Sequence, residues 1–182
     1  ENLRSVKMRT MPVGKLLFAM SMPAILSMLV QALYNVVDSI FISYYSQKGI
    51  DALSIAFPMQ TLIIAFAVGI GVGANAQIAK KLGERKNEEA SCTARNALFL
   101  TFCTVVLFIV LGLTVSRPFI AAYSADAETV EMGVAYLTIV MSVSFGAFIE
   151  ITLSKILQAT GNMIVPMISQ LLGAIINIIL DP

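Results

Sequence analysis

Two stretches of this sequence place polar side chains at helical spacing within otherwise apolar runs. In the first stretch, polar residues recur three or four positions apart and end in an aspartate: Ser27, Gln31, Tyr34, Asn35 and Asp38. In the second stretch, one helix face holds Gln170, Asn177 and Asp181, with Gly173 and Ala174 between them leaving clearance. Carboxylates placed in this way can bind and release protons, and together with amides they can hold a cation.

The depth of each aspartate decides whether the two can act together. At 1.5 Å per residue, Asp38 lies ~34 Å from Lys15 and Asp181 lies ~27 Å from Met163. A carboxylate inside a membrane span costs about 2.5–3.5 kcal/mol on insertion scales, so it usually faces an internal cavity. We therefore expect Asp38 and Asp181 to meet in one cavity. The alternative is that both lie hydrated at the membrane interface.

The segments that must position these residues are long and apolar. Of the 182 residues, 58% are hydrophobic and 13% are charged, and the mean hydropathy is +0.85. Five stretches are long enough to cross the hydrocarbon core; they cover residues 16–44, 53–78, 97–115, 130–153 and 164–180. The sequence therefore predicts an all-α polytopic membrane protein with about five transmembrane helices.

The charged residues predict which way these helices cross the membrane. All basic residues except Lys48 and Arg117 fall on one side of the predicted spans. Because cytoplasmic loops carry an excess of lysine and arginine, the amino terminus is predicted to be cytoplasmic. The last span ends directly at Asp181 and Pro182, so we expect the chain to be part of a longer protein.

Composition argues against several classes of function. There is no histidine, which removes the commonest metal ligand and general base, and no nucleophile–base pair suggests an enzyme. We expect no cofactor, and no metal beyond a possible sodium ion at Asp38, Asn177 and Asp181. The net charge of +1 gives no field that would attract nucleic acid.

Glycines and prolines inside the spans predict close packing and hinges. Gly69 and Gly73 have the spacing of a small-residue packing face, whereas a dinucleotide site would need a preceding strand. Pro23 and Pro58 leave backbone carbonyls without their usual donors. Each proline is a candidate hinge, with a static kink as the alternative.

Three segments resemble the multidrug and toxic compound extrusion (MATE) transporters: MPVGKLLFAMSMPAILSMLVQALYNVVDSIFIS, AFPMQTLIIAFAVGIGVGANAQIAKKLGERK and the terminal NIILDP. The resemblance implies a twelve-helix protein made of two six-helix lobes. Residues 1–182 would then form most of the amino-terminal lobe, without its sixth helix and without the second lobe.

The resemblance also implies roles for individual residues. Tyr34, Asp38, Asn177 and Asp181 would line a cation site, and the first helix would bend at Pro23 on protonation. Gln31, Asn35 and Gln170 would line the adjoining cavity. Ser154 is the residue that this chain offers where relatives carry a polar group in the fourth helix.

The expected function is therefore a multi-pass antiporter of the prokaryotic cytoplasmic (inner) membrane, coupled to protons or sodium. It would export amphipathic, often cationic drugs and toxic compounds, with membrane lipid and the second lobe as its other partners. Two alternatives remain. One is a flippase of similar architecture for lipid-linked cargo, and the other is a helical bundle without transport activity.

Overall fold

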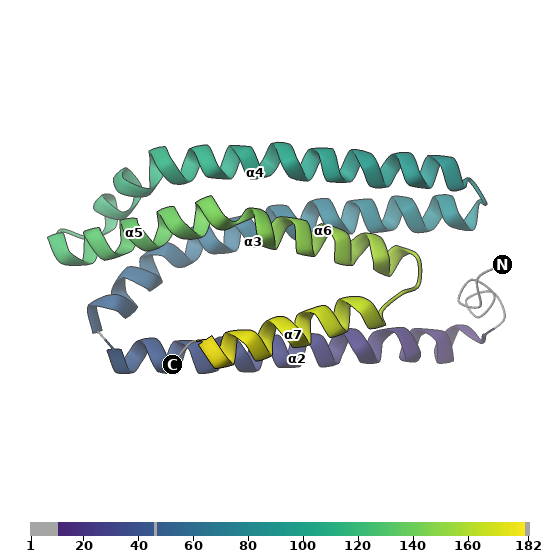
Figure 1. The fold of residues 1–182 in the computed structure, drawn as a ribbon, viewed down its shortest axis with the longest axis horizontal. Coiled ribbons are helices and arrows are strands. Elements are labelled where there is room, and N and C mark those ends of the chain that lie inside the picture. The colour runs from purple at the N-terminus through teal and green to yellow at the C-terminus, as the bar shows by residue number, and fades with distance from the viewer. Residues whose placement is uncertain (1–10, 46, 181–182) are drawn as a thin grey trace.

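In the computed structural model, helices run back and forth along one long axis (Figure 1). The structure describes residues 11–45 and 47–180, without the side chains of residues 20, 27, 31, 34, 35, 37–45, 47, 48, 177, 178 and 180. The helices are α2 (Val13–Tyr45), α3 (Gln47–Gly83), α4 (Asn87–Tyr123), α5 (Ala127–Val143), α6 (Phe145–Ala159) and α7 (Ile164–Leu180). No strand occurs among the described residues, and the predicted all-α fold is confirmed.

Length and apolar composition let most of these helices cross a membrane. Among the described residues, three helices meet both criteria: α2, through Val13–Val30, α3, through Gly49–Gly83, and α4. The helices α5 and α6 meet at an angle of 42°, and the pair is long and apolar enough to make a fourth span when it is counted as one. α7 is a shorter apolar helix of 17 residues. These segments overlap the five predicted spans, and the predicted span over 130–153 is divided between α5 and α6.

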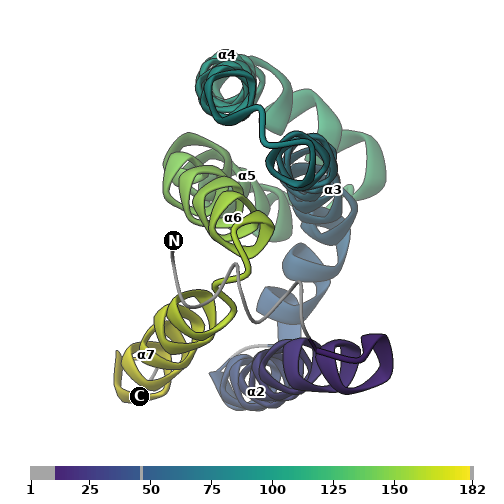
Figure 2. The ribbon, with the colours of Figure 1, turned by 90° about the vertical axis from the view of Figure 1, so that its right-hand side faces the viewer.

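The helices fall into two groups (Figure 2). The four-helix group consists of α3, α4, α5 and α6, which pack against one another, and the α2–α7 pair lies beside it. α2 and α7 run side by side in the same direction (Figure 1). The second halves of these two helices therefore lie toward the same end of the bundle.

The hydrophobic core lies inside the four-helix group. Its largest fully buried hydrophobic side chains are Phe108, Phe148, Ile120, Leu137 and Met141. The ring centroid of Phe108 lies 5.4 Å from that of Phe148 and 5.5 Å from that of Phe66. A buried pair of hydroxyl groups, from Thr101 of α4 and Thr152 of α6, is 2.9 Å apart. These contacts hold α4 against both α3 and α6.

Glycines allow close approach at different positions from those predicted. A Cβ atom on Gly112 would lie 2.6 Å from Cβ of Met141, and one on Gly71 would lie 2.8 Å from Cγ of Lys155. No described atom lies within 4 Å of a Cβ built on Gly69 or Gly73. The prediction that Gly69 and Gly73 form a packing face is therefore wrong for the described residues. The face of α3 that approaches α6 is the one that carries Gly71.

The break between α5 and α6 and the bend in α3 have local causes. Ser144 lies between the two helices, and its hydroxyl donates a hydrogen bond of 2.7 Å to the carbonyl of Met141. The backbone N–H of Ser144 donates to the same carbonyl over 3.4 Å, so two donors of Ser144 cap the end of α5. α3 changes direction in its first half (Figure 1), where Pro58 cannot donate to the carbonyl of Ser54.

Candidate functional site

The two polar stripes predicted from the sequence lie on α2 and α7, the two helices that pack together. The backbone of Gln31, Tyr34, Asn35 and Asp38 is helical. Their side chains, and that of Asn177, lie outside the described part of the structure, as does the whole of Asp181. The fold thus brings the two helices that carry the stripes together, while the predicted contacts between Asp38, Asn177 and Asp181 stay predictions.

Among the residues predicted for the two stripes and the hinge, Gln170 and Pro23 have described side chains. Gln170 is half-buried on α7, and it shares a face with the buried residues Pro166 and Ala174 at spacings of four residues. Asn177 follows Ala174 by three residues and so belongs to the same face by spacing. Pro23 lies inside α2 and is half-buried. Because proline has no backbone N–H, the carbonyl of Ala19 lacks its usual helical donor.

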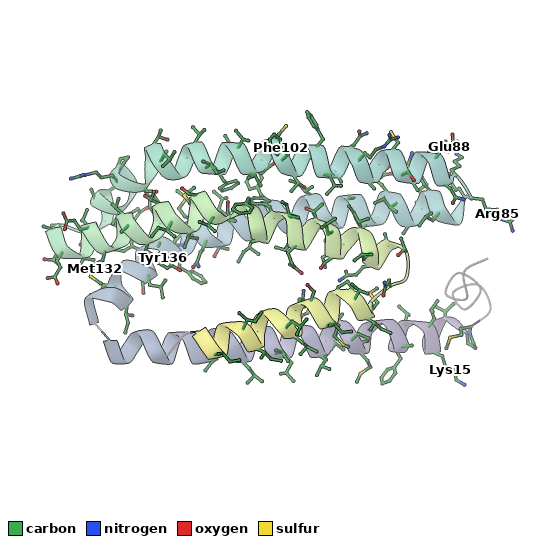
Figure 3. All side chains as sticks on the ribbon, viewed as in Figure 1. Lys15, Arg85, Glu88, Phe102, Met132 and Tyr136 are labelled. Carbon is green, nitrogen blue, oxygen red and sulfur yellow. The ribbon has the colours of Figure 1, made fainter. Side chains whose placement is uncertain are left out.

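A polar contact that the sequence did not single out joins α3 to α5. The side-chain amide of Gln60 donates a hydrogen bond of 2.8 Å to the hydroxyl of Tyr136. Tyr136 lies on the side of α5 that is turned toward the α2–α7 pair (Figure 3). The sequence contains one signal for this contact: Gln60 and Tyr136 each interrupt an apolar span. A polar group without a hydrogen-bond partner is costly there, so each residue could be expected to have a partner.

A second set of polar side chains lies on α6, nearer the loop that contains Arg85. The hydroxyl of Ser154 is buried and donates to the carboxylate of Glu150 over 2.8 Å. The ammonium group of Lys155 lies 3.3 Å from Oε1 of Gln158. The amide of Asn75 on α3 donates to the Lys155 carbonyl over 2.7 Å. Ser154, which the resemblance put forward as a polar contributor, is thus engaged by a carboxylate of its own helix.

Basic residues from the start of α2 and from the α3–α4 connection lie at one end of the bundle. Lys15, Arg85 and Glu88 lie at that end in Figure 3, which we call the Arg85 end. Across the loop, the ammonium group of Lys81 lies 2.8 Å from Oε2 of Glu89. A hydrogen bond and the negative charge of Glu84 raise the pKa of Lys86 above its ordinary value of 10.5. This end matches the basic side that the sequence predicts.

A shallow hollow of about 480 Å³ lies at the connection between α4 and α5. Its lining comes from α3 and from the α4–α5 connection: Asp51, Ser54, Ile55, Tyr123, Ser124, Asp126 and Thr129. The carboxylate of Asp126 caps α5 by accepting hydrogen bonds from the backbone N–H and the hydroxyl of Thr129. Asp51 is exposed. The structural role of Asp126 explains its position, and we assign the hollow no function.

The described residues include no group of three or more His, Cys, Asp or Glu side chains that could hold a metal ion. The predicted sodium ligands Asp38, Asn177 and Asp181 fall outside that set. A monovalent cation site at those residues therefore stays a prediction.

Comparison with known proteins identifies relatives of this arrangement. The model of the family described as MatE matches residues 23–182. The FAD transporter of Shewanella oneidensis is 28% identical over 174 residues, which are 94% of this chain and 38% of that protein. The multidrug export protein MepA of Staphylococcus aureus (strain MRSA252) is 24% identical over 172 residues, again 94% of this chain and 38% of that protein.

A solved structure has the same fold. A MOP superfamily transporter from Pyrococcus furiosus, for which the reverse polarity of the binding pocket suggests a different function, superimposes with a TM-score of 0.94 at 28% identity. The match covers 100% of this chain and 40% of that one. The chain thus spans about two-fifths of the length of the relatives that it matches.

Proposed function

We propose that this chain, which belongs to the MatE family of membrane transporters, carries the cation-coupling site of an antiporter that exports small amphipathic compounds. The coupling ion is a proton or sodium. Asp38 and Asp181 bind it, Asn177 and Tyr34 complete the site, and Gln31, Asn35 and Gln170 line the adjoining cavity. No step of this function requires an enzymatic reaction or a cofactor.

The observation that carries this proposal is the pairing of α2 with α7. The two helices lie side by side and run in the same direction, although more than a hundred residues separate them in the chain. The carboxylates at Asp38 and Asp181 belong to the second half of α2 and to the residue after α7. A parallel pair of helices supports their meeting at one end of the bundle.

Coupling requires that the cation and the substrate prefer different conformations. A ligand shifts an equilibrium between two states only by its difference in affinity for them. The cation therefore favours the state that holds the substrate weakly, and by linkage the substrate favours release of the cation. Pro23 supplies the position at which α2 bends between the two states, because the Ala19 carbonyl has no helical donor there.

The names of the relatives indicate two candidate classes of substrate. MepA is a multidrug export protein, which supports varied amphipathic compounds, often cationic. The Shewanella relative is an FAD transporter, and a flavin dinucleotide carries phosphate anions. Among the described residues of α5, α6 and α7, Lys155 is the one cationic side chain. A cavity lined by the acidic residues Asp38 and Asp181 therefore favours cations, and an anionic cargo is the second candidate.

The same basic residues set the proposed orientation. The Arg85 end gathers lysine and arginine from the start of α2 and from the α3–α4 connection. By the positive-inside rule this end faces the cytoplasm, which puts the amino terminus inside and the protein in the inner membrane of a prokaryote. The second lobe of the transporter is its proposed partner.

Export from proteoliposomes tests the proposed site. Full-length protein carrying Asp38→Asn or Asp181→Asn is compared with unchanged protein under a pH gradient and, separately, under a sodium gradient. We expect each variant to insert normally and to lose gradient-driven export of an organic cation. Asp51→Asn, which neutralises an exposed aspartate, is the matched control and should export at the unchanged rate. Unchanged export by Asp38→Asn would exclude this coupling site.

A further inference from the structure

The side of α3 that points away from the four-helix core is exposed. Five residues at alternating spacings of three and four form one row along it: Leu62, Ala65, Gly69, Val72 and Ala76. Leu62 and Val72 are 41% and 50% exposed, and the other three residues are exposed as well. No described atom lies within 4 Å of a Cβ built on Gly69. We call this row the outer face of α3.

α3 uses its other side to pack within the four-helix group. Ala56, Ile63 and Ala67 of α3 belong to the hydrophobic core. At about 100° per residue, Ala65 lies about 200° from Ile63, so the outer face is turned away from that core. Gly73 lies about 60° to one side of the outer face and is not part of it. α3 therefore has a second face, which the described helices leave exposed.

The outer face of α3 lies within the hydrocarbon region. The span Gly49–Gly83 contains 35 residues, and a hydrocarbon core of ~30 Å takes up about 20 residues of a helix. When it is centred on that span, the core covers about residues 56–76 and so includes the whole outer face. Because water is absent at this depth, either lipid chains or another helix must cover these residues.

The outward side of α4 has a different composition. It also lies at membrane depth, and the residues of its row are 45% to 70% exposed and large throughout: Phe99, Phe102, Val106, Val110 and Leu113. The outer face of α3 has a glycine and two alanines among its five residues. Lipid chains are as apolar as leucine, so helices associate in membranes through close packing, and small residues let two backbones approach. The composition of the outer face of α3 therefore favours a helix as its cover.

The lengths of the relatives indicate where such a helix comes from. The matched part is 38% of the Shewanella FAD transporter and 40% of the Pyrococcus transporter, so the larger part of each protein lies outside the match. In the proposed antiporter, the corresponding part of the chain contains the second lobe. An antiporter must keep its path closed to one side of the membrane at a time. The two lobes must therefore contact each other within the hydrocarbon region, and one exposed face of the first lobe must be covered.

We propose that the outer face of α3 is the surface on which a helix of the second lobe packs. Ala65, Gly69 and Ala76 let the two backbones approach closely, while Leu62 and Val72 supply the larger contacts on either side of Gly69. The face runs from the middle of α3 toward Gly83 at the Arg85 end. The contact between the lobes therefore lies in the half of the membrane that is proposed to be cytoplasmic. This inference rests on the proposed function, which supplies the second lobe.

Spin labels on matched valines test whether protein or lipid covers this face. Val72 on α3 and Val106 on α4 are 50% and 45% exposed. Each is replaced by a spin-labelled cysteine in full-length protein in lipid vesicles, after removal of the native cysteines, Cys92 and Cys103 included. We expect the label at Val72 to be immobilised and several-fold less accessible to oxygen than the label at Val106. Equal mobility and equal oxygen accessibility at the two positions would overturn the proposal.

Photo-crosslinking identifies what covers the face and does not depend on introducing a label at its centre. Benzoylphenylalanine replaces Leu62, which is already the largest residue of the row, or Phe102 on the outward side of α4 as the control. Mass spectrometry of peptides from the full-length protein then locates the adduct. We expect Leu62→benzoylphenylalanine to crosslink to residues of the same chain beyond residue 182, and the control to crosslink to lipid. An adduct at position 62 with lipid, or with a second copy of the chain, would overturn the proposal.

These measurements separate this inference from the proposed coupling site, because neither of them depends on transport. An adduct between position 62 and the chain beyond residue 182, together with unchanged export by Asp38→Asn, supports the contact between the lobes and removes the coupling site. Loss of export by Asp38→Asn together with a lipid adduct at position 62 has the opposite meaning. It supports the coupling site and contradicts the packing of the second lobe on the outer face of α3.

Discussion

Gln60 of α3 and Tyr136 of α5 are joined by a hydrogen bond of 2.8 Å inside the membrane-spanning part of the bundle. Hydrogen bonds between transmembrane helices contribute about 0.6 kcal/mol on average. We predict that Tyr136→Phe lowers the free energy of unfolding by at least about this amount, since the ring remains and the hydrogen bond with Gln60 is lost. The measurement is unfolding in bicelles, with Gln60→Leu and the double variant completing a double-mutant cycle. Strictly additive effects of the two substitutions would contradict a direct bond.

The Gln60–Tyr136 hydrogen bond is a contact that could not be predicted from the sequence, unlike the spans and the polar stripes. Hydropathy predicts the spans because crossing helices must be apolar over about twenty residues, and α3 and α4 indeed contain the predicted spans. The stripes on α2 and α7 could be found because their polar residues repeat along one helix. Gln60 and Tyr136 are single polar residues on different helices, and only the packing of α3 on α5 brings them together.

The spacing of the glycines in α3 predicted the wrong packing face for a related physical reason. Gly69 and Gly73 have the periodicity of a packing face, but periodicity does not state which face of α3 meets a neighbour. The neighbour α6 contacts the face that carries Gly71. The break between α5 and α6 was also missed, because it occurs at Ser144 within a continuous apolar run without proline. Nothing in the hydropathy of residues 130–153 marks it.

The close contact at Gly112 leads to a prediction about packing. A Cβ atom there would lie 2.6 Å from Cβ of Met141, an atom that cannot move without shifting the backbone of α5. We predict that Gly112→Ala lowers the free energy of unfolding by about 1–3 kcal/mol. Gly73→Ala is the matched control, because its added Cβ meets no described atom within 4 Å. It should be neutral or stabilising by up to about 1 kcal/mol through helix propensity. Equal effects of the two substitutions would argue against this packing.

The hydroxyl pair between α4 and α6 predicts an asymmetry between two conservative substitutions. Thr101 also lies 2.8 Å from the carbonyl of Ala97, so its hydrogen is donated within α4 and Thr152 supplies the hydrogen between the helices. Thr101→Val then leaves the buried Thr152 hydroxyl without a described acceptor, whereas Thr152→Val leaves Thr101 still bonded to Ala97. We expect Thr101→Val to be the more destabilising, by about 1 kcal/mol. Thermal unfolding of both variants checks this order, and the reverse order would show that the hydrogen runs from Thr101 to Thr152.

Two serines at the break between α5 and α6 predict effects of opposite sign. The hydroxyl of Ser142 is buried and has no hydrogen-bond partner among the described residues, whereas the hydroxyl of Ser144 donates 2.7 Å to the Met141 carbonyl. A buried polar group without a partner costs about 1–3 kcal/mol, and a satisfied hydrogen bond contributes about 1 kcal/mol. We therefore predict that Ser142→Ala raises the free energy of unfolding and that Ser144→Ala lowers it.

The two substitutions remove the same atom only two residues apart, so each serves as the control for the other. Unfolding of both variants in bicelles gives the two signs in one experiment. If Ser142→Ala is as destabilising as Ser144→Ala, the Ser142 hydroxyl has a partner after all, and the break at Ser144 is held by two hydroxyl groups. If the signs differ as predicted, the Ser144 hydroxyl stabilises the bend of 42° at this point, because it adds a second, shorter hydrogen bond to the Met141 carbonyl that the backbone N–H of Ser144 reaches only over 3.4 Å.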